Sequence, residues 1–282
     1  VYRHMADIPT LIVGPSGTGK DLVAQAIGYS RYLAFDEARL RFVETFTSQF
    51  HALNVSALSR GLVESELFGH RRGAFTGAQA DRQGWLELCG PDGSVFLDEI
   101  GELGTELQVK FLRVLQTREF QRIGETKPRM FLGKLLAATH RDLDLGLQEG
   151  WFREDLYYRL CADRIQTPTL SARISADPNE LLRMISVLSE RIAGLEHGPA
   201  LAKEVMQWIE RELGTGYGWP GNVRELEQCV RNVLVRKRYR PAQRAPQTGS
   251  LDQALLDSQL SSEALLDRYA ALVYRETQNY VE

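Results

Sequence analysis

Short apolar runs separated by polar and glycine-rich loops predict a sheet of buried strands. Three such runs, rich in Leu, Ile, Val, Phe and Ala, occupy residues 10–13, 94–97 and 134–139. Runs of this length suit strands that are buried on both faces of a parallel sheet. The first run leads through a glycine loop into a helical pattern from Asp21 to about Ser30. This alternation predicts an α/β fold, with a doubly wound parallel sheet, right-handed crossovers and helices on both faces.

The apolar spacing becomes helical in the second half of the chain. Apolar positions three and four residues apart recur over 179–192 and 201–213, which predicts a small α-helical lid domain after the sheet. Pro, Gln and Gly then become frequent, as in a linker. The predicted division is an α/β domain at 1–168, the lid at 169–240, a linker at 241–250 and a further helical segment at 251–282.

Residues 31–50 connect the first helical pattern to the next part of the α/β domain. The apolar residues of this segment are spaced as on one face of a helix, which predicts an inserted or extended amphipathic helix. These residues are Leu40, Phe42, Val43, Phe46 and Phe50.

Composition narrows the class of protein. The chain has 282 residues, of which 43% are hydrophobic, enough for one large or two smaller cores. The 34 basic and 37 acidic residues nearly balance, so charge alone does not indicate a nucleic-acid-coating or membrane-surface protein. The three cysteines, which form no metal-ligand spacing, are interpreted as small buried hydrophobic residues in a reducing cytoplasm. No apolar run approaches the roughly 20 residues of a membrane helix.

A glycine loop between the first strand and the first helix carries the pattern of a phosphate-binding loop. Backbone N–H groups of such a loop surround the β and γ phosphates of a nucleotide, the helix N-terminus adds positive potential, and a lysine adds a point charge. The residue after the lysine, commonly a Ser or Thr that binds Mg²⁺, is the acid Asp21 here. The predicted ATP-binding residues are Gly14, Pro15, Ser16, Gly17, Thr18, Gly19, Lys20 and Asp21.

The second predicted half of the ATP site is a pair of acids at the end of an apolar strand. Asp98 and Glu99 follow residues 94–97, and a parallel strand delivers such side chains to the carboxyl edge of the sheet. We expect Asp98 to hold Mg²⁺, directly or through water, with Asp21 as a further candidate ligand. Glu99 is expected to activate or position the attacking water. Together with the glycine loop, the pair predicts an ATPase.

Polar residues elsewhere fit the same site. Thr139 and His140 end the third apolar run, beside the γ-phosphate if the sheet is parallel. Arg153 and Arg159 are suited to phosphoryl oxygens, because a guanidinium is planar and always charged. The alternative for these two arginines is a pair of surface ion pairs with the neighbouring acids Glu154 and Asp155. Arg224 lies in the first turns of a helix that follows a Trp-Pro-Gly turn.

These motifs, in this order, resemble the AAA+ central domain of bacterial enhancer-binding proteins, which activate RNA polymerase carrying sigma-54. The resemblance spans roughly residues 8–238, and its most specific part is the run Gly-Ala-Phe-Thr-Gly-Ala. It implies that the run contacts sigma-54. The residues of this predicted partner loop are Gly73, Ala74, Phe75, Thr76, Gly77 and Ala78.

The resemblance also implies roles for single residues. Asn54 matches the asparagine that holds the water-activating glutamate, here Glu99, until the nucleotide state releases it. Thr139 and His140 match the first sensor, where the family more often has asparagine at the second position. Arg224 matches the second sensor. Arg153 and Arg159 match arginine fingers that complete a neighbour's site, which implies a homo-oligomer, in this family a hexameric ring.

The partner loop also has a physical interpretation. Its two glycines bracket Ala-Phe-Thr and form a tight, hinged loop with an aromatic ring and a hydroxyl at the tip. An exposed phenylalanine is an anchor for a partner protein. The alternative is a glycine hairpin packed against the core.

The C-terminal residues 261–282 resemble the opening helix of a Fis-type helix-turn-helix. This resemblance implies that enhancer DNA is a partner through a recognition helix that the sequence does not contain. Two other functions remain open: an AAA+ remodelling ring with a different client, or an ATP-binding interaction module with weak hydrolysis, suggested by Asp21 and His140.

Overall fold

The computed structural model describes residues 8–32, 35–36, 41–42, 50–214 and 216–241. The chain divides into two compact units, Val1–Arg238 and Tyr239–Glu282. The predicted linker and C-terminal helical segment lie, apart from Pro241, outside the described residues. The domain boundaries proposed from the sequence therefore stay predictions.

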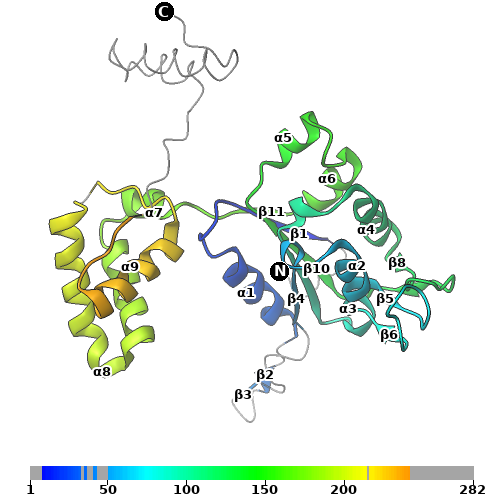
Figure 1. Cartoon of the computed structure of the whole chain (residues 1–282), viewed down its shortest axis with the longest axis horizontal. Helices are drawn as coiled ribbons and strands as arrows, with labels where there is room; N and C mark the ends of the chain where they lie inside the picture. Colours follow the sequence, from blue (N-terminus) through cyan, green and yellow to red (C-terminus); the bar gives the residue numbers. More distant parts are fainter. Residues whose placement is uncertain (1–7, 33–34, 37–40, 43–49, 215, 242–282) are drawn as a thin grey trace, which may run out of the picture. The chain divides into compact units, whose positions relative to one another are not determined.

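A five-stranded sheet forms the centre of the first unit (Figure 1). Its strands, in spatial order, are β11 (Arg164–Gln166), β1 (Thr10–Val13), β10 (Lys134–Thr139), β7 (Ser94–Asp98) and β4 (Phe50–Asn54). Every neighbouring pair is parallel. The three strands predicted from apolar runs are confirmed, and their carboxyl ends meet at one edge of the sheet, where ligands bind in folds of this kind.

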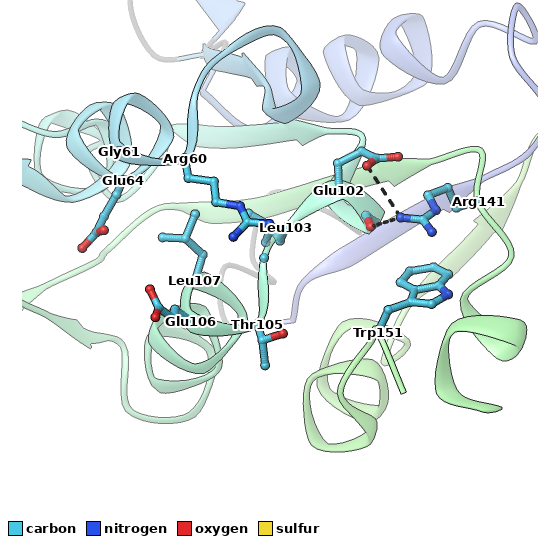
Figure 2. A pocket seen from close by; sticks show the side chains of 12 residues that line it. Arg60, Gly61, Glu64, Glu102, Leu103, Thr105, Glu106, Leu107, Arg141 and Trp151 are labelled. Atoms are coloured by element: carbon cyan, nitrogen blue, oxygen red, sulfur yellow. Dashed lines mark hydrogen bonds and ion pairs between the residues drawn. The ribbon is translucent and has the colours of Figure 1, made fainter. Parts of the chain in front are cut away.

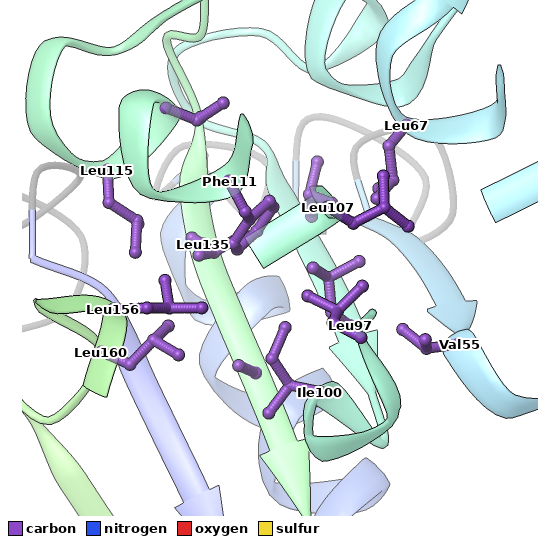
Figure 3. Close-up of a cluster of buried hydrophobic side chains, with 14 of the residues drawn as sticks. Val55, Leu67, Leu97, Ile100, Leu107, Phe111, Leu115, Leu135, Leu156 and Leu160 are labelled. Carbon is purple, nitrogen blue, oxygen red and sulfur yellow. The ribbon is translucent and has the colours of Figure 1, made fainter. Parts of the chain in front are cut away.

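Alternate residues along these strands pack against helices on opposite faces. On one face Leu11, Leu97 and Leu135 join a large core with α4 (Thr105–Thr117) and α6 (Glu154–Leu160), shown in Figure 3. On the other face Ile12, Phe96 and Leu136 pack with α1 (Lys20–Tyr32). Because a strand turns successive side chains to opposite faces, this division into two cores confirms the doubly wound class.

Shorter elements complete the α/β part. The helical ones are η2 (Val55–Ala57), α2 (Arg60–Phe68), α3 (Trp85–Leu88), η3 (Ile100–Glu102) and α5 (Leu143–Gln148). In the described part of the chain, three two-stranded antiparallel pairs lie outside the main sheet. They join β2 (Phe35–Asp36) to β3 (Arg41–Phe42), β5 (Gly69–His70) to β6 (Arg82–Gln83), and β8 (Glu119–Phe120) to β9 (Arg129–Met130).

The predicted helix in the 31–50 segment is wrong at two of its positions. Phe42 belongs to the β2–β3 pair, and Phe50 opens β4 opposite Ser94 of β7. The ring of Phe50 packs on Phe96, with 6.0 Å between the ring centroids. The helical spacing of apolar residues gave the wrong prediction here, because packing against the sheet places Phe50 in a strand. The other three positions, Leu40, Val43 and Phe46, lie outside the described residues.

Helices follow the sheet, as the spacing predicted. They are α7 (Leu170–Ala176), α8 (Glu180–Glu212) and α9 (Asn222–Arg236). The long α8 is two helices joined at Gly194, whose φ of +79° is not helical. The buried stripes of α8 and α9 pack against each other, and they include Ile185, Val205, Leu226 and Val230.

Candidate active site and partner loop

The glycine loop from Gly14 to Gly19 connects β1 to the first turn of α1. Gly17 has a φ of +80° and Gly19 a φ of +86°, a backbone region that glycine adopts without strain. The Lys20 Nζ donates to the carbonyl oxygens of Gly14, at 2.9 Å, and Pro15, at 3.2 Å. Burial lowers the pKa of Lys20, an effect that the nearby acids Glu99 and Asp98 oppose. The lysine therefore lies over the loop, within the electrostatic reach of both acids.

Asp98 ends β7 and lies opposite Asn54 of β4. The Asn54 amide Nδ2 donates to Asp98 Oδ2 at 3.0 Å, while its Oδ1 accepts from the backbone of Ser56 and Ala57. Burial is the main cause that raises the pKa of Asp98, and the charge of Glu99 raises it further. A carboxylate in this setting is stabilised by added positive charge.

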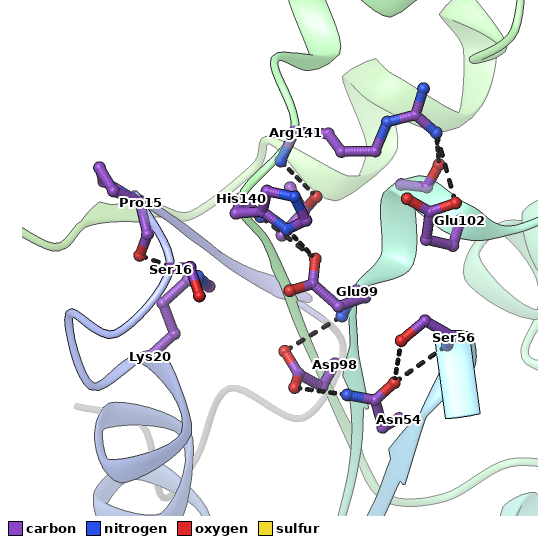
Figure 4. Close-up of polar contacts among 12 residues, drawn as sticks. Pro15, Ser16, Lys20, Asn54, Ser56, Asp98, Glu99, Glu102, His140 and Arg141 are labelled. Carbon is purple, nitrogen blue, oxygen red and sulfur yellow. Dashed lines mark hydrogen bonds and ion pairs between the residues drawn. The ribbon is translucent and has the colours of Figure 1, made fainter. Parts of the chain in front are cut away.

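Glu99 turns away from β4. Its backbone is left-handed, with φ of 58° and ψ of 48°. The carboxylate Oε2 accepts from the ring Nδ1 of His140 at 2.7 Å and from the His140 backbone N–H at 3.3 Å (Figure 4). The expected contact between Asn54 and Glu99 is therefore absent among the described residues, where Asn54 instead bonds Asp98. The left-handed turn explains the difference, because it directs consecutive acids to different neighbouring strands.

The residues at this edge fit ATP and Mg²⁺. The loop supplies positive-φ glycines, an N-terminal helix turn and a lysine, as a polyphosphate requires. The charge of Glu99 adds to burial in raising the pKa of Asp98, so a cation bound beside Asp98 would stabilise its charged form. Asp21 is exposed in the first turn of α1, and its charge contributes to the raised pKa of Asp98. Its role as a second metal ligand stays a prediction.

The start of α9 reaches the glycine loop. Arg224 donates to the Ser16 Oγ at 3.0 Å, and the backbone N–H of Val223 donates to the Gly17 carbonyl oxygen at 3.0 Å. Buried Asn222 joins three elements, because its Nδ2 donates to the Ser16 carbonyl oxygen and its Oδ1 accepts from the Leu170 backbone N–H. The predicted second sensor thus lies at the loop, where ATP would bind.

Two residues of this junction were missed in the sequence. Asn222 has a φ of +55°, which asparagine tolerates better than most residues, and its place after Trp-Pro-Gly was the available signal. Thr167 bonds Thr18, with 2.7 Å between the two hydroxyl oxygens, and donates its backbone N–H to Val13. Nothing in the local pattern around Thr167 indicates this contact.

The two predicted arginine fingers lie on and beside α6. Arg153 forms a two-pronged ion pair with Asp155, at 3.0 and 2.7 Å. Arg159 is exposed and has no ion-pair partner among the described residues. Neither arginine contacts Lys20 or Glu99 in that part of the chain. Within this chain, Arg153 thus forms an ion pair of the kind that the alternative predicts. The action of Arg153 and Arg159 on a neighbouring subunit stays a prediction.

The partner loop lies between β5 and β6. The Gly73 N–H donates to the Ala78 carbonyl oxygen at 2.9 Å, which closes the base of the loop. Phe75 is 41% exposed at the tip and packs edge-on against His70, with 5.0 Å between ring centroids. His70 is itself buried and bonded to Ser65 at 2.8 Å. The loop therefore projects from the core with its aromatic residue half-accessible, unlike a fully packed hairpin.

A second loop, between β8 and β9, supports the first. Ile123 donates to the Gly69 carbonyl oxygen at 2.9 Å and accepts from the Arg71 N–H at 3.0 Å. Below this contact, Glu87 accepts two bonds from Arg122, at 2.8 and 2.6 Å, and one from Arg129 at 2.7 Å. The guanidinium of Arg122 is the main cause that lowers the pKa of Glu87. The base of both loops is thus held by a nearly buried charge cluster.

A polar cavity of about 630 Å³ lies between the start of α2, the segment from Gly101 to Leu107, and Arg141 with Trp151 (Figure 2). Arg141, the residue after His140, lines it and stacks on Trp151, with 3.6 Å from its guanidinium carbon to the ring centroid. Arg141 also donates to the Gly101 carbonyl oxygen at 2.9 Å. Arg141, which follows His140, is thus bonded to Gly101, which lies two residues after Glu99.

Two of the three cysteines are buried, as their interpretation as small hydrophobic residues predicts. Cys89 and Cys229 are buried, and burial raises the pKa of each thiol to about 12. Cys161 is half-buried, and burial again raises its pKa. Over the described part of the chain, no group of three or more His, Cys, Asp or Glu is arranged to hold a metal, and no helix is both long and apolar enough to cross a membrane.

Residues 3–166 match the family described as "Sigma-54 interaction domain". The chain belongs to this family of sigma-54-dependent enhancer-binding activators. The sigma-54 interaction domain covers the glycine loop, both acids, the partner loop and the α6 arginines.

Relatives agree with this assignment. The chain is 41% identical over 230 residues to the DNA-binding transcriptional regulator NtrC of Klebsiella pneumoniae, covering 82% of this chain and 45% of that protein. It is 40% identical over 234 residues to the regulatory protein AtoC of Escherichia coli (strain K12), covering 82% and 46%. The chain therefore spans about half the length of the curated relatives it matches.

A solved structure has the same fold. NtrX from Brucella abortus matches with a TM-score of 0.63 and 25% identity, over 99% of this chain and 61% of that one. The structure of NtrX in complex with ATP matches with a TM-score of 0.62 and 27% identity, over 93% and 56%. The expected AAA+ α/β fold is confirmed.

Proposed function

We propose that this protein is an ATP-hydrolysing transcriptional activator that remodels the closed promoter complex of RNA polymerase carrying sigma-54. The observation that carries the proposal is one sigma-54 interaction domain that combines a glycine loop and acidic pair with a projecting Phe75–Thr76 tip. Family membership supports the ATPase class in general. Contact between the partner loop and sigma-54 is our inference from the exposed tip.

Each residue of the site has a part in this scheme. The loop N–H groups and Lys20 would hold the phosphates, and Asp98 would hold Mg²⁺, which neutralises phosphate charge when bound. Glu99 would orient the attacking water, and Thr139 with His140 lies beside it at the end of β10. Arg224, already bonded to Ser16, would report the bound nucleotide to α9.

The proposed partners follow from the same residues. Arg153 and Arg159 would complete the site of the next subunit, which requires a homo-oligomer; we propose a hexameric ring. Residues 251–282, as the start of a Fis-type helix-turn-helix, would belong to a module for enhancer DNA. A partner in bacterial transcription implies action in the cytoplasm.

The enzymatic part is tested by ATP hydrolysis. Glu99→Gln keeps the size of the side chain and removes the carboxylate, so we expect a rate at least about 100-fold below that of the unmodified protein. ATP binding should remain, because Lys20 and the loop are unchanged. Equal rates in the two proteins would instead support the interaction module with weak hydrolysis.

The partner is tested by trapping. We expect the protein, bound to ADP and an aluminium fluoride that mimics the transferred phosphoryl group, to form a stable complex with purified sigma-54. Thr76→Ala should abolish the complex, whereas Thr117→Ala, at an exposed threonine of α4, should retain it. No complex with the unmodified protein, or an undiminished one with Thr76→Ala, would favour an AAA+ ring with a different client.

A further inference from the structure

The carboxylate of Glu99, which we propose positions the attacking water, bonds His140 at the end of β10. The expected partner was Asn54 on β4. Glu99 Oε2 lies 2.7 Å from His140 Nδ1, at the end of β10. Asn54, on β4, is occupied by Asp98 and by the backbone of η2. A carboxylate can only accept, so Nδ1 carries the proton in this contact. Among the described residues, His140 is therefore the side chain that donates a hydrogen bond to Glu99.

The order of the strands shows to which side of β7 the Glu99 side chain is turned. β10 lies between β1, which leads into the glycine loop, and β7, which carries Glu99. β4 lies on the opposite side of β7. A Glu99 side chain bonded to His140 is thus turned toward the glycine loop, and one bonded to Asn54 would be turned away from it.

We propose that His140 is a positioning residue that holds the Glu99 carboxylate on the nucleotide side of the sheet before ATP binds. The proposal rests on the ATPase function proposed above. In place of a contact with phosphate, it assigns His140 to the water-activating group. A misplacement of about 1 Å at such a group costs up to roughly 100-fold in rate, so holding the carboxylate is a sufficient role.

The donor atom explains which replacement would preserve the role. In histidine, Nδ1 is bonded to Cγ, and in asparagine the amide nitrogen is bonded to Cγ in the same way. Asparagine at position 140 would therefore keep a donor for Glu99 and lose only the outer ring nitrogen. The His140 side chain is 46% exposed, so replacing it should cost little folding stability.

The first test separates turnover from binding. We expect His140→Ala to lower kcat about 10- to 100-fold, with ATP and ADP dissociation constants unchanged within about 2-fold. His140→Asn should restore most of kcat. His197→Ala, at an exposed histidine of α8, serves as the matched control. An unchanged kcat in His140→Ala, or a selective loss of ATP over ADP binding, would overturn the proposal.

The second test asks whether His140 acts through Glu99. In single-turnover measurements on Glu99→Gln, adding His140→Ala should change the residual rate by less than about 2-fold, because the group that His140 positions is already disabled. If the two losses multiply instead, His140 acts on another group and the proposal fails.

A third measurement does not depend on hydrolysis. In nucleotide-free protein with ¹⁵N-labelled histidine, the His140 ring signals should shift between the unmodified protein and Glu99→Ala, which lacks the acceptor. The same His140 signals in both proteins would remove the contact. A shift in a protein that does not hydrolyse ATP would refute the proposed function while leaving the contact established.

Discussion

At the scale of the residue, glycines with a positive φ determine the path of the loop at the candidate nucleotide site. Gly17 keeps a positive φ, and a Cβ added there would lie 2.4 Å from the carbonyl oxygen of Gly221, just before α9. Gly150 has a similar φ of +75°, but a Cβ there would meet nothing within 4 Å. An alanine at either position would have the same strained backbone, but only at Gly17 would its Cβ also meet neighbouring atoms, those of Gly221 and Arg224.

Gly17→Ala and Gly150→Ala should each lose about 1–2 kcal/mol of unfolding free energy through the left-handed backbone. Gly17→Ala should lose roughly 1–3 kcal/mol more through overlap with the Gly221 carbonyl, and it should also weaken ATP binding. Urea unfolding and nucleotide titration measure the two effects. Equal losses in both variants would show that the contact with α9 contributes nothing.

At the scale of the element, the partner loop depends on the charge cluster at its base. Glu87 of α3 is 15% exposed and its partner Arg122 is 8% exposed, so the pair is well shielded from water. Arg129 reaches the same carboxylate from β9. One acid therefore ties α3 to both ends of the second loop, which in turn supports the first.

Neutralising that acid should loosen the loops. Glu87→Gln takes from nearly buried Arg122 the carboxylate that it bonds, whereas Arg129 keeps its ion pair with Glu125. We therefore expect a loss of about 2 kcal/mol in unfolding free energy at pH 7. Glu210→Gln, at an exposed position of α8, should change it by less than about 0.5 kcal/mol. Denaturant unfolding of both variants checks the contrast, and a similar small change in both would contradict it.

The same acid gives a pH dependence with a definite sign. The pKa of Glu87 is lowered from 4.5 in the folded protein, so its contribution is fully present above pH 4.5. It is lost as the pH falls through the folded-state pKa. The stability difference between the unmodified protein and Glu87→Gln should therefore shrink in acid below pH 4.5. A difference that grows in acid would have the wrong sign.

At the scale of the whole molecule, we propose that a second copy of the chain completes the site. Arg159 is exposed on α6 with no ion-pair partner among the described residues, and Arg153 is engaged there only by Asp155. A site completed by a neighbour hydrolyses ATP only in an assembly, since arginine supplies charge stabilisation to the transferring phosphoryl group.

Mixing two inactive variants tests this arrangement. Arg159→Ala keeps Glu99, and Glu99→Gln keeps Arg159, so a mixed assembly contains some sites with both intact groups. Each variant alone should be at least about 100-fold below the unmodified protein, and the mixture should recover a measurable part of the activity. Mixing with Lys20→Ala in place of Arg159→Ala is the control, because Lys20 and Glu99 act in the same site. No recovery in the first mixture would refute action in trans.

The elements of the nucleotide site could be predicted because their signals are local. A strand, a glycine loop and a helix follow one another directly over residues 10–32, and Asp98 ends its own strand. The lid helices likewise show in their own periodicity. The predicted helix over the 31–50 segment failed at Phe50 because the partners of that ring, Phe96 and Tyr29, lie elsewhere in the chain.

The chemistry of the proposed site could thus be predicted from the order of its motifs, because each motif consists of residues that are neighbours along the chain. The hydrogen-bond partner of Glu99 could not be predicted in this way. His140 is 41 residues away, and its approach depends on the placement of β10 beside β7 and on the left-handed turn at Glu99. The same holds for Asn222, 206 residues from Ser16. Such contacts arise from strand order and packing between distant segments, and no local pattern encodes them.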